Sequence, residues 1–364
     1  MAHASPAQRR LTVRCESGSW VTLDDATGRA ISKWRGEGVL ELAGRDEDDD
    51  WLTVDLRASG ACAPLPDIRF DGGVGGYDGM SIVGDGIASA SYEPSAGETG
   101  TGRFRIGSST VSFSNLEPLD VSGMTTFTAP LGSPVVATLA NGVDFATGTN
   151  GALVLSGTSV GVPFESIAFR NITSLAITTG YFGGPSPDDV ITLASSNVTA
   201  GITNIAVVTT SPGNDYVHVN GPFFFFTGTV QLGSATIDEG ASGSIGAVGL
   251  RVDALGSVTL DQHNGVVQLA GTASSNFVFK SDIAFHIGSV LGETGISAGG
   301  NLTLGSADTI DVGAPMSAGG PIVVQAPVNV KARRAGDENG DGFADVSDVF
   351  YLINYLFAGG PAPY

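Results

Sequence analysis

The residues with the clearest capacity for chemistry lie near the C-terminus, in the segment from Asp337 to Asp348. Oxygen-bearing side chains occupy its first, third, fifth, ninth and twelfth positions: Asp337, Asn339, Asp341, Asp345 and Asp348. A glycine at the sixth position, Gly342, permits a sharp turn, and the Phe343 carbonyl would be a backbone ligand at the seventh. Ca²⁺ takes six to eight oxygen ligands, so this spacing predicts a calcium loop with these residues as ligands. An acidic turn without metal is the alternative interpretation.

The residues after this loop predict a helix. Apolar side chains recur there at helical spacing, at Val349, Leu352, Ile353 and Leu356. Gly359, Gly360 and Pro361 then form a stop signal. Residues 321–331 before the loop have the character of a strand, so no entering helix is expected.

A calcium loop followed by a helix, with no helix before it, resembles the half-repeat of a type I dockerin over roughly residues 336–363. The resemblance implies that the residues named above bind Ca²⁺. It also implies docking onto a partner, such as a cohesin-like protein or a component of the cell envelope. The chain departs from the family in carrying one half-repeat instead of two. Its pair at loop positions 10 and 11, Val346 and Ser347, is less polar than usual.

The rest of the chain predicts many short strands. Apolar and polar residues alternate between turns of Gly, Ser, Asn or Asp in segments 11–14, 51–56, 110–113, 153–155, 258–260 and 302–304. An Asp precedes such alternation at Asp50, Asp78, Asp189, Asp215 and Asp308. A single strand-and-turn unit cannot bury its own apolar face, whereas a stack of units can. We therefore predict an all-β fold with a parallel β-helix or β-solenoid body; an array of β-sandwich modules is the alternative.

Two regions of the body resemble known classes of secreted protein. Residues 228–329, with Gly-bounded strands about every ten residues, resemble the parallel β-helix stretches of bacterial surface and autotransported proteins. Residues 48–123 are similar to modules of large secreted bacterial proteins and to the glycine-rich calcium repeats of exported toxins. The segment Gly72–Asp78 has one residue too many before Asp78 for that calcium repeat, so a plain turn is expected there.

The expected organisation has three parts. Residues 1–10 are expected to be a disordered N-terminal segment, residues 11–334 the solenoid body with a subdivision near residue 130, and residues 335–364 the dockerin-like half-module. Two cysteines, Cys15 and Cys62, would pair in an exported protein and would be buried thiols otherwise.

The charge composition of the chain excludes some classes of binding partner. With 17 Lys and Arg against 37 Asp and Glu, the net charge is −20, which argues against nucleic acid and anionic membrane surfaces. No apolar run is long enough to predict a membrane span. The charge suits an extracellular or cell-surface location. Because residues 1–10 lack the apolar region of a signal peptide, we expect the N-terminus to be incomplete.

Evidence for catalysis is weaker. The histidines His3, His218, His263 and His286 have no metal-ligand spacing, and neither a nucleophile elbow nor a phosphate loop is found. We expect His218 to be a packed or surface residue. Carboxylates of a polysaccharide hydrolase or lyase could come from Asp188, Asp189, Asp215, Asp238 and Glu239, although all of them suit turns. The cations Arg170, Arg251 and Lys280 are the few bases in this region.

The run Phe223–Phe226 predicts core packing at a bend, with a partner-binding or sugar-binding face as the alternative. Together these patterns favour an exported structural or adhesive protein whose C-terminal half-module binds Ca²⁺ and attaches the body to a partner. The alternative is a polysaccharide lyase or glycoside hydrolase of β-helix type with a dockerin-like anchor. No catalytic residue is assigned, and an enzymatic role is the less favoured of the two.

Overall fold

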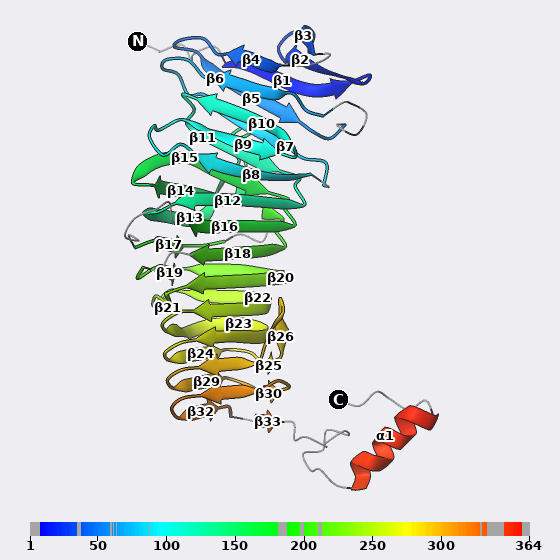
Figure 1. Ribbon diagram of the computed structural model, residues 1–364, viewed down its shortest axis with the longest axis vertical. Coiled ribbons are helices and arrows are strands. Elements are labelled where there is room, and N and C mark those ends of the chain that lie inside the picture. The colour runs from blue at the N-terminus through cyan, green and yellow to red at the C-terminus, as the bar shows by residue number, and fades with distance from the viewer. Residues whose placement is uncertain are drawn as a thin grey trace.

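The computed structural model describes residues 8–34, 38–58, 60, 62, 64–86, 88–180, 188–196, 200–209, 213–327, 330–332 and 346–358. These residues form 33 strands and one helix, α1 (Val346–Ala358). The predicted all-β class is confirmed. The strands form a tall stack of coils, with β1 at one end and β32 and β33 at the other, and α1 follows the last coil (Figure 1).

Two long ladders of strands make up the stack. The first contains β1 (Gln8–Glu16), β2 (Ser19–Asp24), β3 (Arg29–Trp34), β5 (Asp49–Asp55), β7 (Gly79–Val83), β11 (Pro118–Ser122), β13 (Val135–Val143), β14 (Asn150–Ser159), β15 (Val162–Arg170), β17 (Val190–Leu193), β19 (Tyr216–Val219), β21 (Thr236–Glu239), β24 (Phe277–Ser281), β29 (Leu302–Ser306) and β32 (Ile322–Gln325).

The second ladder contains β4 (Val39–Ala43), β6 (Asp67–Asp71), β8 (Ser89–Pro94), β9 (Gly102–Ile106), β10 (Ser109–Ser114), β12 (Thr126–Gly132), β16 (Ser174–Gly180), β18 (Asn204–Thr209), β20 (Pro222–Ser234), β22 (Ser244–Ala254), β25 (Phe285–Ile287), β28 (Ile296–Ala298), β30 (Ile310–Val312), β31 (Met316–Ala318) and β33 (Val330–Ala332). The long strand β23 (Val258–Ala273) pairs in both ladders, and β26 (Ser289–Val290) pairs with β27 (Glu293–Thr294) alone.

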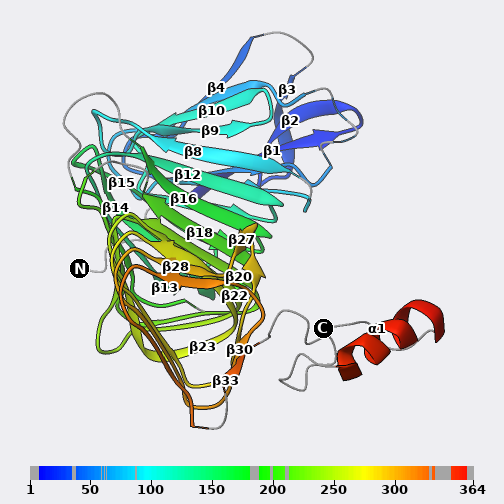
Figure 2. The same cartoon turned by 60° about the horizontal axis from the view of Figure 1, so that its bottom comes forward.

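Parallel pairing between successive coils dominates the architecture. Strand β17 pairs in parallel with β19, β19 with β21, and β21 with β23, so the chain returns to the same side after each coil. Figure 2 shows these coils enclosing a common interior. Antiparallel hairpins interrupt the pattern at β1–β2–β3, β8–β9–β10 and β13–β14–β15. The pairing between successive coils is thus mainly parallel, whereas sandwich modules are built from antiparallel sheets.

The interior is a continuous apolar column built by alternation. In β16, for example, every second residue is buried, as expected for a strand with one face on a core. The parallel registers align equivalent residues from coil to coil, so that Ile191, Val217, Ile237, Val258, Phe277 and Leu302 lie in one buried row. Each coil thus completes the core of its neighbours.

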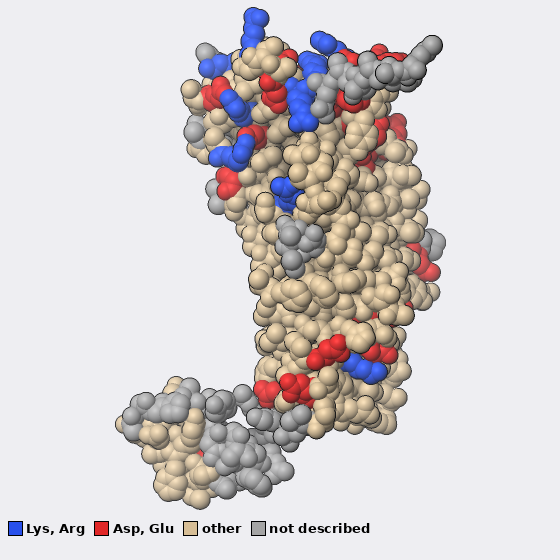
Figure 3. Space-filling model, turned by 180° about the vertical axis from the view of Figure 1, so that it is seen from behind, with Lys and Arg blue, Asp and Glu red and all other residues tan. Residues whose placement is uncertain are grey.

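Charged side chains are unevenly distributed over this stack. Lys, Arg, Asp and Glu gather around the N-terminal end on the face that Figure 3 shows, whereas the middle of that face is almost free of charge. Within the described ranges, no helical segment has the length and apolar character of a membrane span.

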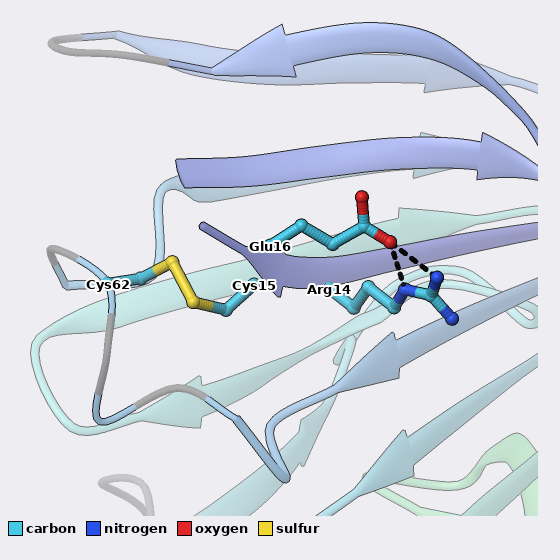
Figure 4. The surroundings of a disulfide bond; sticks show 4 residues. All are labelled: Arg14, Cys15, Glu16 and Cys62. Atoms are coloured by element: carbon cyan, nitrogen blue, oxygen red, sulfur yellow. Dashed lines mark hydrogen bonds and ion pairs between the residues drawn. A yellow bond between two sulfur atoms is a disulfide. The ribbon is translucent and has the colours of Figure 1, made fainter. Parts of the chain in front are cut away.

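The N-terminal coils are closed by a disulfide. Cys15 in β1 is bonded to Cys62, which lies 47 residues later in the loop between β5 and β6 (Figure 4). Strand β1 begins at Gln8, so residues 8–10, predicted to be disordered, instead pair with residues 49–51 of β5. The body therefore begins earlier than expected, because these residues complete a parallel ladder that their local composition does not indicate.

Loss of the disulfide should destabilise the N-terminal coils. The double variant Cys15→Ser/Cys62→Ser is expected to lower the free energy of unfolding of that end by roughly 2–4 kcal/mol, because the bond closes a loop of 47 residues in the unfolded chain. Hydrogen exchange would measure the effect. Amides of β1–β6 should exchange faster, whereas amides of β24–β32 serve as the internal control. An equal increase at both ends would contradict local coupling between coils.

Candidate functional site

The predicted calcium loop is only partly within the described residues. Asp337, Asn339, Asp341, Phe343 and Asp345 lie outside them. Asp348 is described: it lies in the first turn of α1 and is buried, with 3% of its surface exposed. The predicted helix is confirmed, and it ends at Ala358, directly before the glycine pair of the expected stop signal.

Helix α1 exposes a wide apolar face. Its exposed apolar side chains are Val346, Val349, Phe350, Leu352, Ile353, Tyr355, Leu356 and Phe357. Phe357 is the most exposed of them, at 83%. An isolated helix of 13 residues is marginal in water and derives most of its stability from packing of such a face. The face therefore has the composition of a contact surface.

The Asp residues that precede strands have a shared structural role. The Asp50 backbone N–H donates a hydrogen bond of 2.7 Å to Oδ1 of Asp78, which occupies the equivalent position in the next coil. The Asp78 N–H in turn donates to Oε2 of Glu117 at 2.8 Å. Both Asp50 and Asp78 are 1% exposed. These carboxylates satisfy backbone donors at the corner of the stack, where the strand ladder begins.

The same arrangement recurs further along the chain. The Asp189 N–H donates to Oδ1 of Asp215 at 2.9 Å, and the carboxylate of Asp189 accepts from the Val135 N–H at 2.8 Å and from the Ser133 hydroxyl at 2.7 Å. Asp189 and Asp215 are completely buried. They were candidates for polysaccharide chemistry, but here they serve as backbone acceptors inside the stack. Asp308 departs from the group because its position is exposed.

A small hollow of about 270 Å³ lies beside the first of these ladders, lined by the glycine-rich segment and by Asp78 and Glu117. Burial, together with the nearby carboxylates of Glu117, Asp50 and Asp49, raises the pKa of Asp78 to about 6. Gly73, Gly75 and Gly76 have positive φ angles, which glycine tolerates, so the segment is a tight turn as predicted. In the described part of the chain, no group of three or more His, Cys, Asp or Glu side chains could hold a metal ion.

A larger polar groove, here called the corner groove, lies where the first ladder turns into the second. It has a volume of about 420 Å³ and is lined by Asp261, Gln262, His263, Lys280, Ser281, Asp282, Gly305, Ser306, Ala307 and Gln325. The register of β23 shifts between Leu260 and Asn264, which leaves residues 261–263 outside the regular pairing. This irregularity places one acid, one amide and one histidine side by side on the corner: Asp261, Gln262 and His263.

The corner groove brings together residues from four coils. Leu260 is paired with Phe279 and Leu304 with Val324, so the following positions, Asp261, Lys280, Gly305 and Gln325, succeed one another along the stack. A Cβ atom at Gly305 would lie 3.0 Å from Cγ of Lys280. The missing side chain at Gly305 therefore leaves room for the aliphatic stem of Lys280 to lie across that strand.

The histidines of the body all pair with an acid of the following coil. His263 Nδ1 lies 2.9 Å from Oδ2 of Asp282, His286 Nδ1 lies 2.8 Å from Oδ2 of Asp311, and His218 Nδ1 contacts Oδ1 of Asp238. The acid fixes the imidazole through Nδ1 and leaves Nε2 as the nitrogen for other contacts. Of the three, only the His263 side chain is widely exposed, at 81%. His218 is partly exposed on its strand, as expected for a packed or surface residue.

The phenylalanine run divides between core and surface. Phe223 and Phe225 are buried, which confirms core packing for half of the run. Phe224 and Phe226 lie on the outer side with stacked rings, whose centroids are 5.1 Å apart. Their rings cover Gly246, where an added Cβ would lie 2.8 Å from either ring. The outer pair forms a small flat apolar shelf.

No family model, no curated protein and no solved structure matches this chain. Sequence reasoning named Asp238, Glu239 and Lys280 as candidates, but it did not select His263, Asp261 or Asp282. Asp282 is 19 residues from His263 in sequence, and only the coil register brings it beside His263 and Asp261. The one local signal was the polar run Asp261–Asn264, which interrupts an otherwise alternating strand.

The carboxyl of Asp78 should make stability depend on pH. Its folded-state pKa of about 6 lies above the ordinary value of 3.8, so the stabilisation it gives is complete below pH 3.8 and is lost as the pH rises through about 6. Asp78→Asn keeps an acceptor for the Asp50 N–H without the charge. It should raise the free energy of unfolding by at most about 3 kcal/mol at pH 8 and have little effect at pH 4. Thermal unfolding at both values measures this, with the exposed Asp308→Asn as control. Equal effects at the two pH values would contradict it.

Proposed function

We propose that this protein is a secreted or cell-surface structural or adhesive protein whose C-terminal segment binds Ca²⁺ and attaches the body to a partner. The observation that carries the proposal is the contrast within α1. Its apolar side chains face solvent, whereas the carboxylate-bearing Asp348 of its first turn is buried. Asp348 stands at the twelfth position of the predicted loop, so its carboxylate would be the last oxygen ligand of a cation bound there.

The donor set of that segment fits Ca²⁺ chemically. Asp337, Asn339, Asp341, Asp345 and Asp348 would contribute side-chain oxygens, and Phe343 its carbonyl. Bound Ca²⁺ would neutralise four carboxylates that otherwise repel one another, and it would thereby order the loop against α1. The exposed face of α1 would then be the contact for a partner, which we propose to be a cohesin-like protein or a component of the cell envelope.

The body suits the role of a spacer. Its coils share one apolar column from Leu11 near the N-terminal end to Ile310 near the other. A stack of this kind holds its two ends apart without an inter-domain hinge. The disulfide between Cys15 and Cys62 supports export, because such bonds persist in oxidising compartments.

A second candidate function rests on the corner groove. We propose, as the alternative, a polysaccharide lyase or glycoside hydrolase that acts there. His263, fixed by Asp282, would exchange a proton through Nε2, and Asp261 would be the second carboxylate of the site. The corner groove is open to solvent along several coils, which suits a polymer more than a small molecule.

Calcium should order the C-terminal segment of the full chain. Calorimetric titration is expected to show binding of one ion, with a dissociation constant of roughly 0.1–1 mM as in other extracellular modules, and circular dichroism should show a gain of helix. Asp341→Ala should abolish both signals and leave the β signal of the body unchanged. The control is Asp308→Asn, outside the segment. Melting of the body together with the variant segment would contradict a separate module.

The enzymatic alternative has its own test. Incubation with polysaccharides should release reducing ends for a hydrolase, or ultraviolet-absorbing unsaturated ends for a lyase. His263→Asn should then lower the rate by roughly 10²–10⁴-fold, the usual contribution of a general acid or base. His218→Asn is the matched control, because that histidine is also paired with an acid of the next coil. Absence of product over the whole panel, or equal rates in the two variants, would exclude catalysis by His263.

A further inference from the structure

The corner groove has the shape of a site for an extended ligand. Its lining runs along the stack over four coils, from Asp261 to Gln325, which at strand spacing is roughly 14 Å. Gly305, in the middle of this path, has no side chain and leaves room for the stem of Lys280. A ligand lying in the groove would therefore cross the strands and contact one residue from each coil.

The chemistry of the lining suits hydroxyl groups. Lys280 is exposed and has no ion-pair or hydrogen-bond partner in the part of the chain that the structure describes. Its ammonium can donate three hydrogen bonds. Carboxylates of Asp261 and Asp282 accept, while amides of Gln262 and Gln325 do both. Hydroxyls of a sugar donate and accept in the same way, so they can satisfy donors and acceptors side by side.

The negative charge of the groove and of the whole chain favours neutral glycans over anionic ones. The two carboxylates of the groove outnumber its single lysine, and the chain as a whole carries −20. A polyanion would therefore be repelled both locally and at long range, whereas an uncharged polymer would not.

An apolar surface lies close to this polar lining. Phe224 is paired with Gly246, and Gly246 with Gly265, which follows His263 by two residues in the same coil. The shelf of Phe224 and Phe226 is thus two coils from the groove, roughly 10 Å along the stack. The two rings lie over Gly246, which has no side chain, and Phe226 is 59% exposed. The C–H face of a sugar ring can therefore pack on the shelf.

We propose that the corner groove is a binding site for a neutral glycan, with Lys280 as its central donor and the Phe224–Phe226 shelf as a flanking apolar contact. The inference rests on the proposed adhesive function and names the class of ligand for it. It does not involve the C-terminal calcium segment.

Affinity gel electrophoresis of the full chain tests the site, with a soluble glucan, mannan or xylan in the gel and polygalacturonate as the anionic comparison. At least one neutral polymer should retard the protein. Lys280→Ala should weaken that binding about tenfold, the value of one hydrogen bond to a charged group. Its matched control is Lys33→Ala, an exposed lysine of β3 at the far end of the stack.

A second pair of variants tests the shelf. Phe226→Ala should also weaken retardation, whereas Val136→Ala should not; both side chains are 59% exposed, but Val136 lies on β13, away from the groove.

All gels are run with calcium and with a chelator. Retention of full binding by Lys280→Ala, retardation by polygalacturonate alone, or no retardation by any polymer would overturn the inference. If the chelator abolishes binding, the glycan binds at the calcium segment and not in the corner groove. If binding is independent of calcium and α1 shows no response to calcium, the glycan site is supported and the proposed attachment through the C-terminal segment is not.

Discussion

In-register stacking of successive coils is the constraint on which the rest of the structure depends. Each coil is too thin to bury its own apolar residues, so Val217 is buried only because Ile191 and Ile237 lie above and below it. A slip of one residue would turn every such side chain outward. The register also sets the corners, where the carboxylate of one coil accepts the backbone N–H of its neighbour, as in the pair Asp189 and Asp215. The apolar column and the hydrogen-bonded corners therefore both require the same alignment of successive coils.

The sequence was informative wherever structure is local. Alternation predicted strands such as β5, β10 and β29, because side chains of a strand point alternately to the two faces. The spacing of apolar residues predicted α1, and the glycine pair predicted its end. The Asp residues before strands were recognised as a pattern. Their burial was not foreseen, since an Asp at a turn normally faces solvent.

What remained hidden is the alignment between coils. The sequence separation between hydrogen-bonded partners in neighbouring coils varies. It is 28 residues for Asp50 and Asp78, 26 for Asp189 and Asp215, and 19 for His263 and Asp282. Loops and hairpins of different length make the repeat irregular, so no fixed period reveals which residues become neighbours. The corner groove depends on that alignment at four positions and on a local register shift, and neither is encoded in a short segment.

The direction of the hydrogen bonds between coils has a mechanical consequence. These bonds lie along the long axis of the stack, because they run across the strands. Tension along that axis loads the coils in series. The final coil would yield first, because among the described strands β32 pairs with β29 alone, and it has exposed apolar residues. Release of a coil such as that from Asp189 to Asp215, 26 residues long, would lengthen the chain by about 90 Å. The stack would therefore extend under load in discrete steps and absorb energy gradually, while the coils nearer the N-terminus keep their folded form.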